Sequence, residues 1–85
     1  MSKPKRYHFS VVLEPDIEEP HRFNVPVPML PGCLTYGESI DDALANAREA
    51  IELYVDHLID GGEAVPIEEH PVIATTVMIS PHAAD

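Results

Sequence analysis

The sequence has few basic residues. Only five of its 85 residues are Lys or Arg, against fifteen Asp and Glu, so the formal net charge is −10. Proteins that bind nucleic acids gain most of their affinity from Lys and Arg side chains that displace counterions from phosphates. The only basic cluster, Lys3, Lys5 and Arg6, lies at the N-terminus. We therefore expect no direct binding of DNA or RNA by this chain.

Cysteine and long apolar segments are also scarce. Cys33 is the single cysteine, so no disulfide can form within the chain, which fits a reducing compartment. No apolar run reaches the about 20 residues that a membrane helix needs. The N-terminal sequence MSKPKRYHF lacks the apolar region of a signal peptide. These absences predict a cytoplasmic protein with no membrane contact.

The sequence is that of one small acidic domain. Eighty-five residues suit a single domain spanning 1–85, with an ordered core at about 6–79 and flexible tails at 1–5 and 81–85. Hydrophobic residues make up 45% of the chain, an ordinary share for a globular protein. The acid excess favours a basic protein partner, because opposite charges speed encounter and select complementary surfaces. The alternative is that the acidity only maintains solubility.

Alternating apolar residues predict an antiparallel hairpin. Residues 7–13 and 22–27 each place apolar side chains at every second position, as strands with one face in a core do. The connection between them, residues 14–20, reads as an acidic loop. Pro26 and Pro28 lack N–H groups on the same side of the second strand, so the hydrogen-bond ladder on that side must end near Asn24 or stay unpaired.

A turn and a third strand follow the hairpin. Pro31 and Gly32 predict a turn in which Gly32 takes a positive φ. Residues 33–36 then form a short β-prone segment. We expect it to be the third strand.

The helix is the clearest element of the sequence. Ser39 is a natural N-cap, and Asp42 can complete a pair that resembles a capping box. Gly61 suits the left-handed position that ends a helix. Apolar residues recur at three- and four-residue steps and predict one stripe that packs on a sheet: Ile40, Ala43, Leu44, Ala47, Ile51, Tyr54, Val55 and Leu58.

A fourth strand is predicted at residues 72–79, where β-branched side chains dominate. The element order is then β-β-β-α-β, an α+β fold with one helix packed on one face of a mostly antiparallel four-stranded sheet. If the last strand lies parallel to the first and beside it, the helix is a right-handed crossover.

The sequence shows no constellation of catalytic or metal-binding residues. The five histidines (His8, His21, His57, His70 and His82) lack the spacing of zinc ligands, and one cysteine cannot complete such a site. Cys33 has no neighbouring base to lower its pKa, so we interpret it as a small packed residue. A two-metal nuclease needs carboxylates on its first and last strands, and these strands offer none. We predict no enzymatic activity, no cofactor and no metal.

One continuous stretch carries a specific resemblance. Residues 25–37 (VPVPMLPGCLTYG) and 38–51 (ESIDDALANAREAI) resemble the HicB-like antitoxin family of type II toxin–antitoxin systems, and the likeness extends over roughly residues 6–79. Met29 replaces an acid often found in the family motif. The motif positions expected to be structural are Pro28, Leu30, Pro31, Gly32, Cys33, Thr35, Gly37, Ala43 and Ala47; Leu44, Asn46, Ala50 and Ile51 also match.

The resemblance implies a partial ribonuclease-H-like fold without nuclease activity. It also implies an antitoxin that covers the active site of a small basic HicA-type mRNA interferase. Many family members carry a C-terminal DNA-binding domain, and we interpret this chain as a short form without one. The alternative is an orphan oligomeric protein with a structural or regulatory role and no toxin partner.

Two kinds of contact surface are predicted. A cationic partner is expected to bind acids of the first loop and of the helix: Asp16, Glu18, Glu19, Glu49, Glu52 and Asp56. We also expect self-association as a dimer or tetramer. One helix covers only one sheet face, which leaves Val12, the helix flank at Ile59 and a strand edge open.

Overall fold

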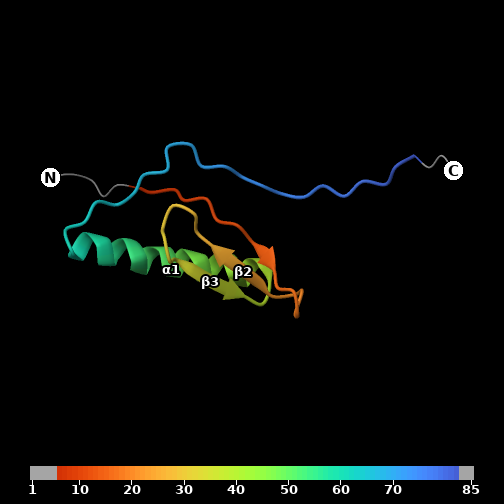
Figure 1. The fold of residues 1–85 in the computed structure, drawn as a ribbon, viewed down its shortest axis with the longest axis horizontal. Helices are drawn as coiled ribbons and strands as arrows, with labels where there is room; N and C mark the ends of the chain where they lie inside the picture. The colour runs from red at the N-terminus through yellow and green to blue at the C-terminus, as the bar shows by residue number, and fades with distance from the viewer. Residues whose placement is uncertain (1–5, 83–85) are drawn as a thin grey trace.

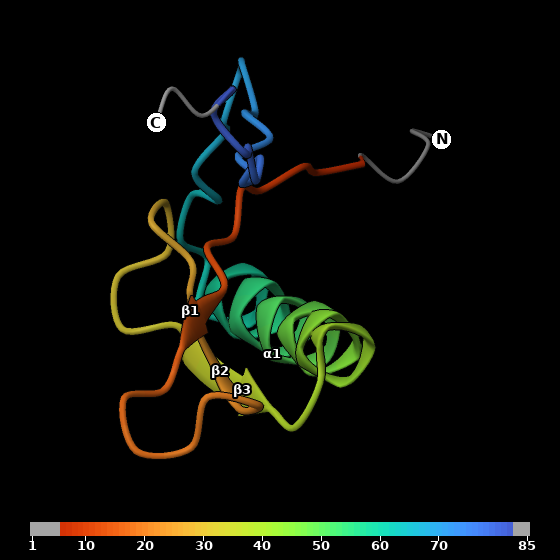
Figure 2. The same ribbon diagram turned by 90° about the vertical axis from the view of Figure 1, so that its right-hand side faces the viewer.

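The computed structural model describes residues 6–82 (Figures 1 and 2). Three short strands precede one long helix: β1 (Glu14–Pro15), β2 (Phe23–Pro26), β3 (Leu34–Gly37) and α1 (Ile40–Asp60). The strand order is β1-β2-β3, and both pairs are antiparallel. The predicted α+β class, with three antiparallel strands followed by a helix, is confirmed. The predicted tail at 1–5 and the last three residues of the tail at 81–85 lie outside the described residues.

The β2–β3 connection folds as predicted. Backbone hydrogen bonds from Leu30 N to Val27 O (3.0 Å) and from Cys33 N to Leu30 O (2.9 Å) form two successive turns. Gly32 takes the expected positive φ of 82°. The result is that the Leu30 side chain points inward and is fully buried.

Local capping fixes both ends of α1. Ser39 Oγ accepts a hydrogen bond from Asp42 N (3.1 Å), and the Asp42 carboxylate accepts one from Glu38 N (2.9 Å). The predicted reciprocal pair therefore forms. It differs from a capping box because the backbone donor to Asp42 is Glu38 N, one residue before the N-cap Ser39. Our prediction for the C-terminus was wrong by one residue. Gly61 N still bonds to His57 O, so the left-handed residue is Gly62, at φ 72°.

The core lies between α1 and one face of the sheet. Its buried side chains form two clusters: Val25, Ala43 and Ala47, and then Val27, Leu30 and Cys33. Small residues let the helix approach closely. A Cβ built on Gly37 would lie 2.8 Å from the backbone carbon of Asp42 and closer still to the backbone of Ala43. The motif residues Leu30, Cys33, Gly37, Ala43 and Ala47 are therefore all buried.

The first strand differs from its prediction. Strand β1 covers only Glu14–Pro15, which we had assigned to the loop, and residues 7–13 run extended without a ladder. One backbone hydrogen bond still joins this segment to β2, from Val12 N to Pro26 O at 3.2 Å. Pro26 has no N–H with which to complete this pair. The ladder therefore ends near Asn24, as the two prolines predicted.

The predicted fourth strand is not formed in the described chain. Residues 72–79 carry no strand pairing, and all of them are exposed. In Figure 1 this blue segment runs clear of the sheet. Its base is held by Ser10, whose Oγ accepts from Val72 N at 2.9 Å and contacts Glu68 Oε2 at 2.5 Å. A strand needs a partner edge for its N–H and C=O groups, and this segment has none.

Candidate interaction surface

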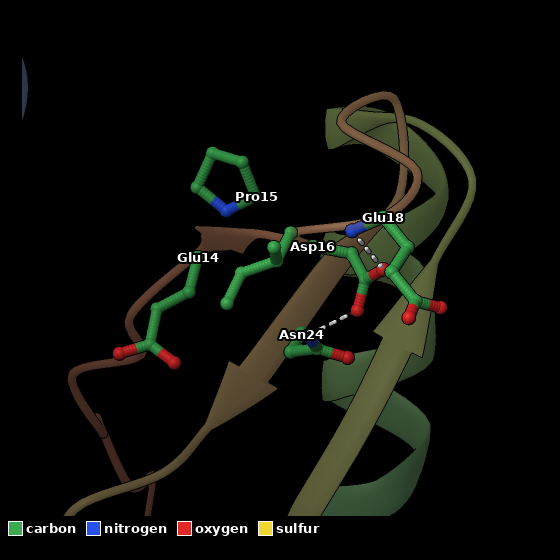
Figure 3. Close-up of a pocket in the computed structure, with 6 residues that line it drawn as sticks. Glu14, Pro15, Asp16, Glu18 and Asn24 are labelled. Atoms are coloured by element: carbon green, nitrogen blue, oxygen red, sulfur yellow. Dashed lines mark hydrogen bonds between the residues drawn. The ribbon is translucent and has the colours of Figure 1, made fainter.

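The loop between β1 and β2 encloses a shallow hollow (Figure 3). It is lined by Glu14, Pro15, Asp16, Ile17, Glu18 and Asn24. The Asp16 carboxylate organises the loop, accepting bonds from the backbone N–H groups of Glu18 and Glu19 (3.1 Å each) and from Asn24 Nδ2 (3.2 Å). The hydrogen bond from Asn24 is the main reason that the pKa of Asp16 lies below its ordinary value. Asp16 thus shapes the loop.

Other loop side chains are free to meet a partner. Ile17 is 95% exposed, although it is a large apolar residue. Glu14 and Glu18 are exposed beside it, and Figure 3 shows their side chains extending from different parts of the loop. An apolar side chain flanked by carboxylates suits a partner with both apolar and cationic groups.

A charged cluster joins this loop to the start of α1. Glu38 accepts from Arg22 Nε at 3.0 Å and lies 3.0 Å from His21 Nε2. A Glu19 carboxylate oxygen lies 3.9 Å from His21 Nε2, and the other lies 3.9 Å from Arg22 Nη2. Arg22 also stacks over the Tyr36 ring at 5.1 Å, and the charge of Glu38 raises the pKa of Arg22. The predicted contact residue Glu19 is therefore partly neutralised by its own chain.

Sequence reasoning missed Glu38. The β2–β3 register pairs Phe23 with Gly37, which brings Arg22 beside Glu38. The contact between Arg22 and Glu38 depends on the register of β2 and β3, which the sequence pattern of the two predicted strands does not determine.

The open face of the sheet is partly apolar. Val25 and Gly37 face α1, so Leu34 and Tyr36 point to the opposite side and are 66% and 54% exposed. Val12 also remains exposed, as predicted. Together with the loop hollow, this face combines apolar side chains with an acidic rim. That composition is typical of protein interfaces.

The predicted helix acids lie elsewhere. Glu49, Glu52 and Asp56 are exposed on α1, and Glu52 makes one weak pair with Arg48 at 3.9 Å. The β1–β2 loop sits at the end of the domain where α1 begins (Figures 1 and 2). Residues 49–56 lie in the second half of α1, away from that end (Figure 1). The six predicted acids therefore form two separate regions.

Groups for metal or thiol chemistry are not assembled in the described chain. No set of three or more His, Cys, Asp or Glu among residues 6–82 could hold a metal ion. Cys33 is buried and burial raises the pKa of its thiol, so our interpretation of it as a packed residue is confirmed. No helix in this part of the chain is long and apolar enough to cross a membrane.

Comparison with known proteins identifies relatives over most of the chain. A model of the HicB-like antitoxins of bacterial toxin–antitoxin systems matches residues 9–82. A UPF0150 protein of Synechocystis is 36% identical over 77 residues, covering 89% of this chain and 95% of its own. A UPF0150 protein of Archaeoglobus fulgidus is 37% identical over 62 residues, or 71% of this chain and 87% of that protein.

A solved structure agrees with these matches. The crystal structure of the N-terminal domain of the Burkholderia pseudomallei antitoxin HicB superposes with a TM-score of 0.61 at 40% identity, covering 71% of this chain and 68% of that one. The family match spans most of the chain and includes the buried motif between β2 and α1. The chain belongs to the HicB-like antitoxin family of bacterial toxin–antitoxin systems.

Proposed function

We propose that this chain neutralises a small basic HicA-type mRNA interferase by covering the toxin's active site. The observation that carries the proposal is the family match over residues 9–82. The net charge of −10 supports it independently, since an RNA-cleaving toxin needs cationic groups to hold its substrate. An acidic protein can occupy the same groups without being cleaved.

The two acidic regions are assigned different tasks. The loop combines Glu14 and Glu18 with exposed Ile17 and adjoins the apolar sheet face, so it supplies close contacts. Asp16 holds the loop in shape through its own hydrogen bonds. The helix acids also have an exposed apolar neighbour, Leu53 (67% exposed), but they do not line the loop hollow. They attract the cationic toxin from a distance, which affects the association rate more than the lifetime of the complex.

Three charge-reversal variants separate these tasks. The loop variant carries Glu14→Lys, Glu18→Lys and Glu19→Lys. The helix variant carries Glu49→Lys, Glu52→Lys and Asp56→Lys. The control carries Asp60→Lys, Glu63→Lys and Glu69→Lys, all exposed positions, and has the same total charge change.

Binding kinetics with the toxin encoded beside this gene provide the test. We expect the loop variant to dissociate at least about tenfold faster, because it loses close contacts. The helix variant should associate more slowly at low salt and dissociate as the unmodified chain does, and the control should bind nearly normally. Equal effects from all three variants would show that only net charge matters. If no basic toxin is encoded nearby and none binds, the orphan oligomeric role replaces this proposal.

A further inference from the structure

We propose that the open face of the sheet, across which Val12, Pro26 and Leu34 form one apolar row, is the centre of the surface that binds the toxin. The partner that fits this face is a basic protein with an exposed apolar patch next to Lys or Arg side chains. This inference rests on the proposed function. It goes further by assigning the apolar contact to the sheet face beside the acidic loop, and not to α1.

The strand register builds the apolar row. Pro26 pairs with Leu34 across β2 and β3, and Val12 N bonds to Pro26 O at 3.2 Å. Residues that lie opposite one another on neighbouring strands place their side chains on the same face of the sheet. Val25, the neighbour of Pro26, is buried against α1, so the Pro26 side chain faces away from the helix. The three side chains therefore lie side by side on the open face.

The row is uncovered within residues 6–82. Leu34 is 66% exposed and Val12 is 41% exposed, and Tyr36, in the next row of the same face, is 54% exposed. The β1–β2 loop projects on this side of the sheet, away from α1 (Figure 2), and carries Ile17, which is 95% exposed. Apolar side chains gathered in this way mark an interaction site, whereas single exposed apolar residues are common on any protein surface.

Leu53 on α1 lacks this setting, although its exposed fraction of 67% is close to that of Leu34. On a helix, the neighbours of a side chain are the residues three and four positions away. The neighbours of Leu53 at these positions include no large apolar residue: Glu49, Ala50, Asp56 and His57. Leu53 is therefore an isolated apolar residue among polar ones, and we assign no apolar contact to it.

Charge on the open face favours a cationic partner over a second copy of the chain. Asn24 pairs with Glu14 on one side and with Tyr36 on the other, so Glu14 lies in the row next to the apolar one. Within the described residues, no hydrogen bond or ion pair uses the carboxylate of Glu14 or Glu18. A two-fold contact would bring these unpaired carboxylates of both copies into one interface, which costs binding free energy, whereas Lys and Arg side chains of a toxin can pair with them.

Affinity for the toxin encoded beside this gene tests the inference with a matched pair of variants. Leu34→Ala and Leu53→Ala remove the same side-chain atoms at similarly exposed positions (66% and 67%). We expect Leu34→Ala to raise the Kd by about tenfold, as the loss of a hot-spot side chain does, and Leu53→Ala to leave it unchanged. Val12→Thr keeps the shape of the side chain but adds a hydroxyl, and should also raise the Kd.

Salt dependence identifies the kind of contact that is lost. The ratio of the Leu34→Ala Kd to that of the unmodified chain should be similar in dilute and in concentrated NaCl, because salt screens charges and not apolar contacts. A ratio that falls towards one in concentrated NaCl would contradict an apolar contact at Leu34. Urea unfolding of each variant without toxin confirms that it is folded.

The outcomes separate this inference from the proposed function. If the unmodified chain binds the toxin and both Leu34→Ala and Val12→Thr bind as tightly, the sheet face is not the centre of the interface, and toxin neutralisation stands. Equal weakening by Leu34→Ala and Leu53→Ala would also overturn the assignment to the sheet. A change in the mass of the toxin-free chain caused by Leu34→Ala, seen by sedimentation equilibrium, would mean that a second copy occupies this face. Absence of binding by the unmodified chain would overturn the proposed function and this inference together.

Discussion

The close approach of β3 and α1 at Gly37 offers the most direct test of the fold. Replacing Gly37 by Ala adds one Cβ, which would lie 2.8 Å from the backbone carbon of Asp42 and closer still to the backbone of Ala43. These atoms belong to the first turn of α1, which Ser39 holds through its carbonyl (2.8 Å to Ala43 N) and its hydroxyl. The clash is with backbone, so no side-chain rotation relieves it.

The expected cost follows from the movement required. Ordinary contact distances are about 3.5–4.0 Å, so the helix start must move by about 1 Å. That shift separates Ala43, which is fully buried, from Val25 in the same cluster. Overpacking of this kind costs about 1–3 kcal/mol. With backbone on both sides we expect a value near 3 kcal/mol, a large part of the about 4–13 kcal/mol typical for a domain of this size.

Urea unfolding followed by circular dichroism measures this free-energy change. Gly61→Ala is the matched control. The Cβ built there has its nearest neighbour, the flexible Glu63 side chain, at 3.4 Å, and φ is −85°. This variant should be neutral or more stable by about 0.4–1 kcal/mol. If Gly37→Ala unfolds at the same urea concentration as the unmodified chain, the described contact between β3 and α1 is wrong.

Two further predictions concern the core and acid stability. Leu30→Ala removes a fully buried side chain and should lower the free energy of unfolding by about 2–5 kcal/mol, whereas Leu34→Ala, on the exposed face, should cost far less; urea unfolding compares them. Hydrogen bonds lower the pKa of Asp16 and of Glu68 in the folded state, relative to unfolded pKa values of 3.8 and 4.5. Each carboxylate therefore stabilises the fold when the pH is above its unfolded pKa. This contribution is lost as the pH falls through the lower, folded pKa. The Asp16→Asn, Glu68→Gln double variant should therefore show a smaller loss of stability between pH 6 and 3, and an unchanged loss would contradict this.

Elements coded by local signals could be predicted from the sequence. The bounds of α1 follow from Ser39 and from the glycines after Asp60, since capping depends on residues only a few positions apart. The turn at Gly32 and the burial of Leu30 follow from the same local chemistry. The end of the β1–β2 ladder near Asn24 could also be predicted, because Pro26 has no N–H to donate to the first strand.

Features that depend on distant partners could not be predicted. Residues 72–79 have strand propensity, but a strand forms only where an edge accepts it, and propensity does not name the edge. The contact of Glu38 with Arg22 required the β2–β3 register. Likewise, the role of Asp16 in shaping its loop required the position of Asn24. The sequence therefore identified the acidic loop without distinguishing the acids that face solvent from those that hold the loop together.

The central proposal is that this chain inhibits a toxin by covering its active site. The most direct measurement is RNA cleavage by the toxin encoded beside the gene, titrated with this chain. We predict that cleavage falls to zero at a fixed molar ratio, and that the loop variant (Glu14→Lys, Glu18→Lys, Glu19→Lys) needs a large excess to do the same. A toxin that continues to cleave RNA at full rate while the chain is bound to it would contradict the account.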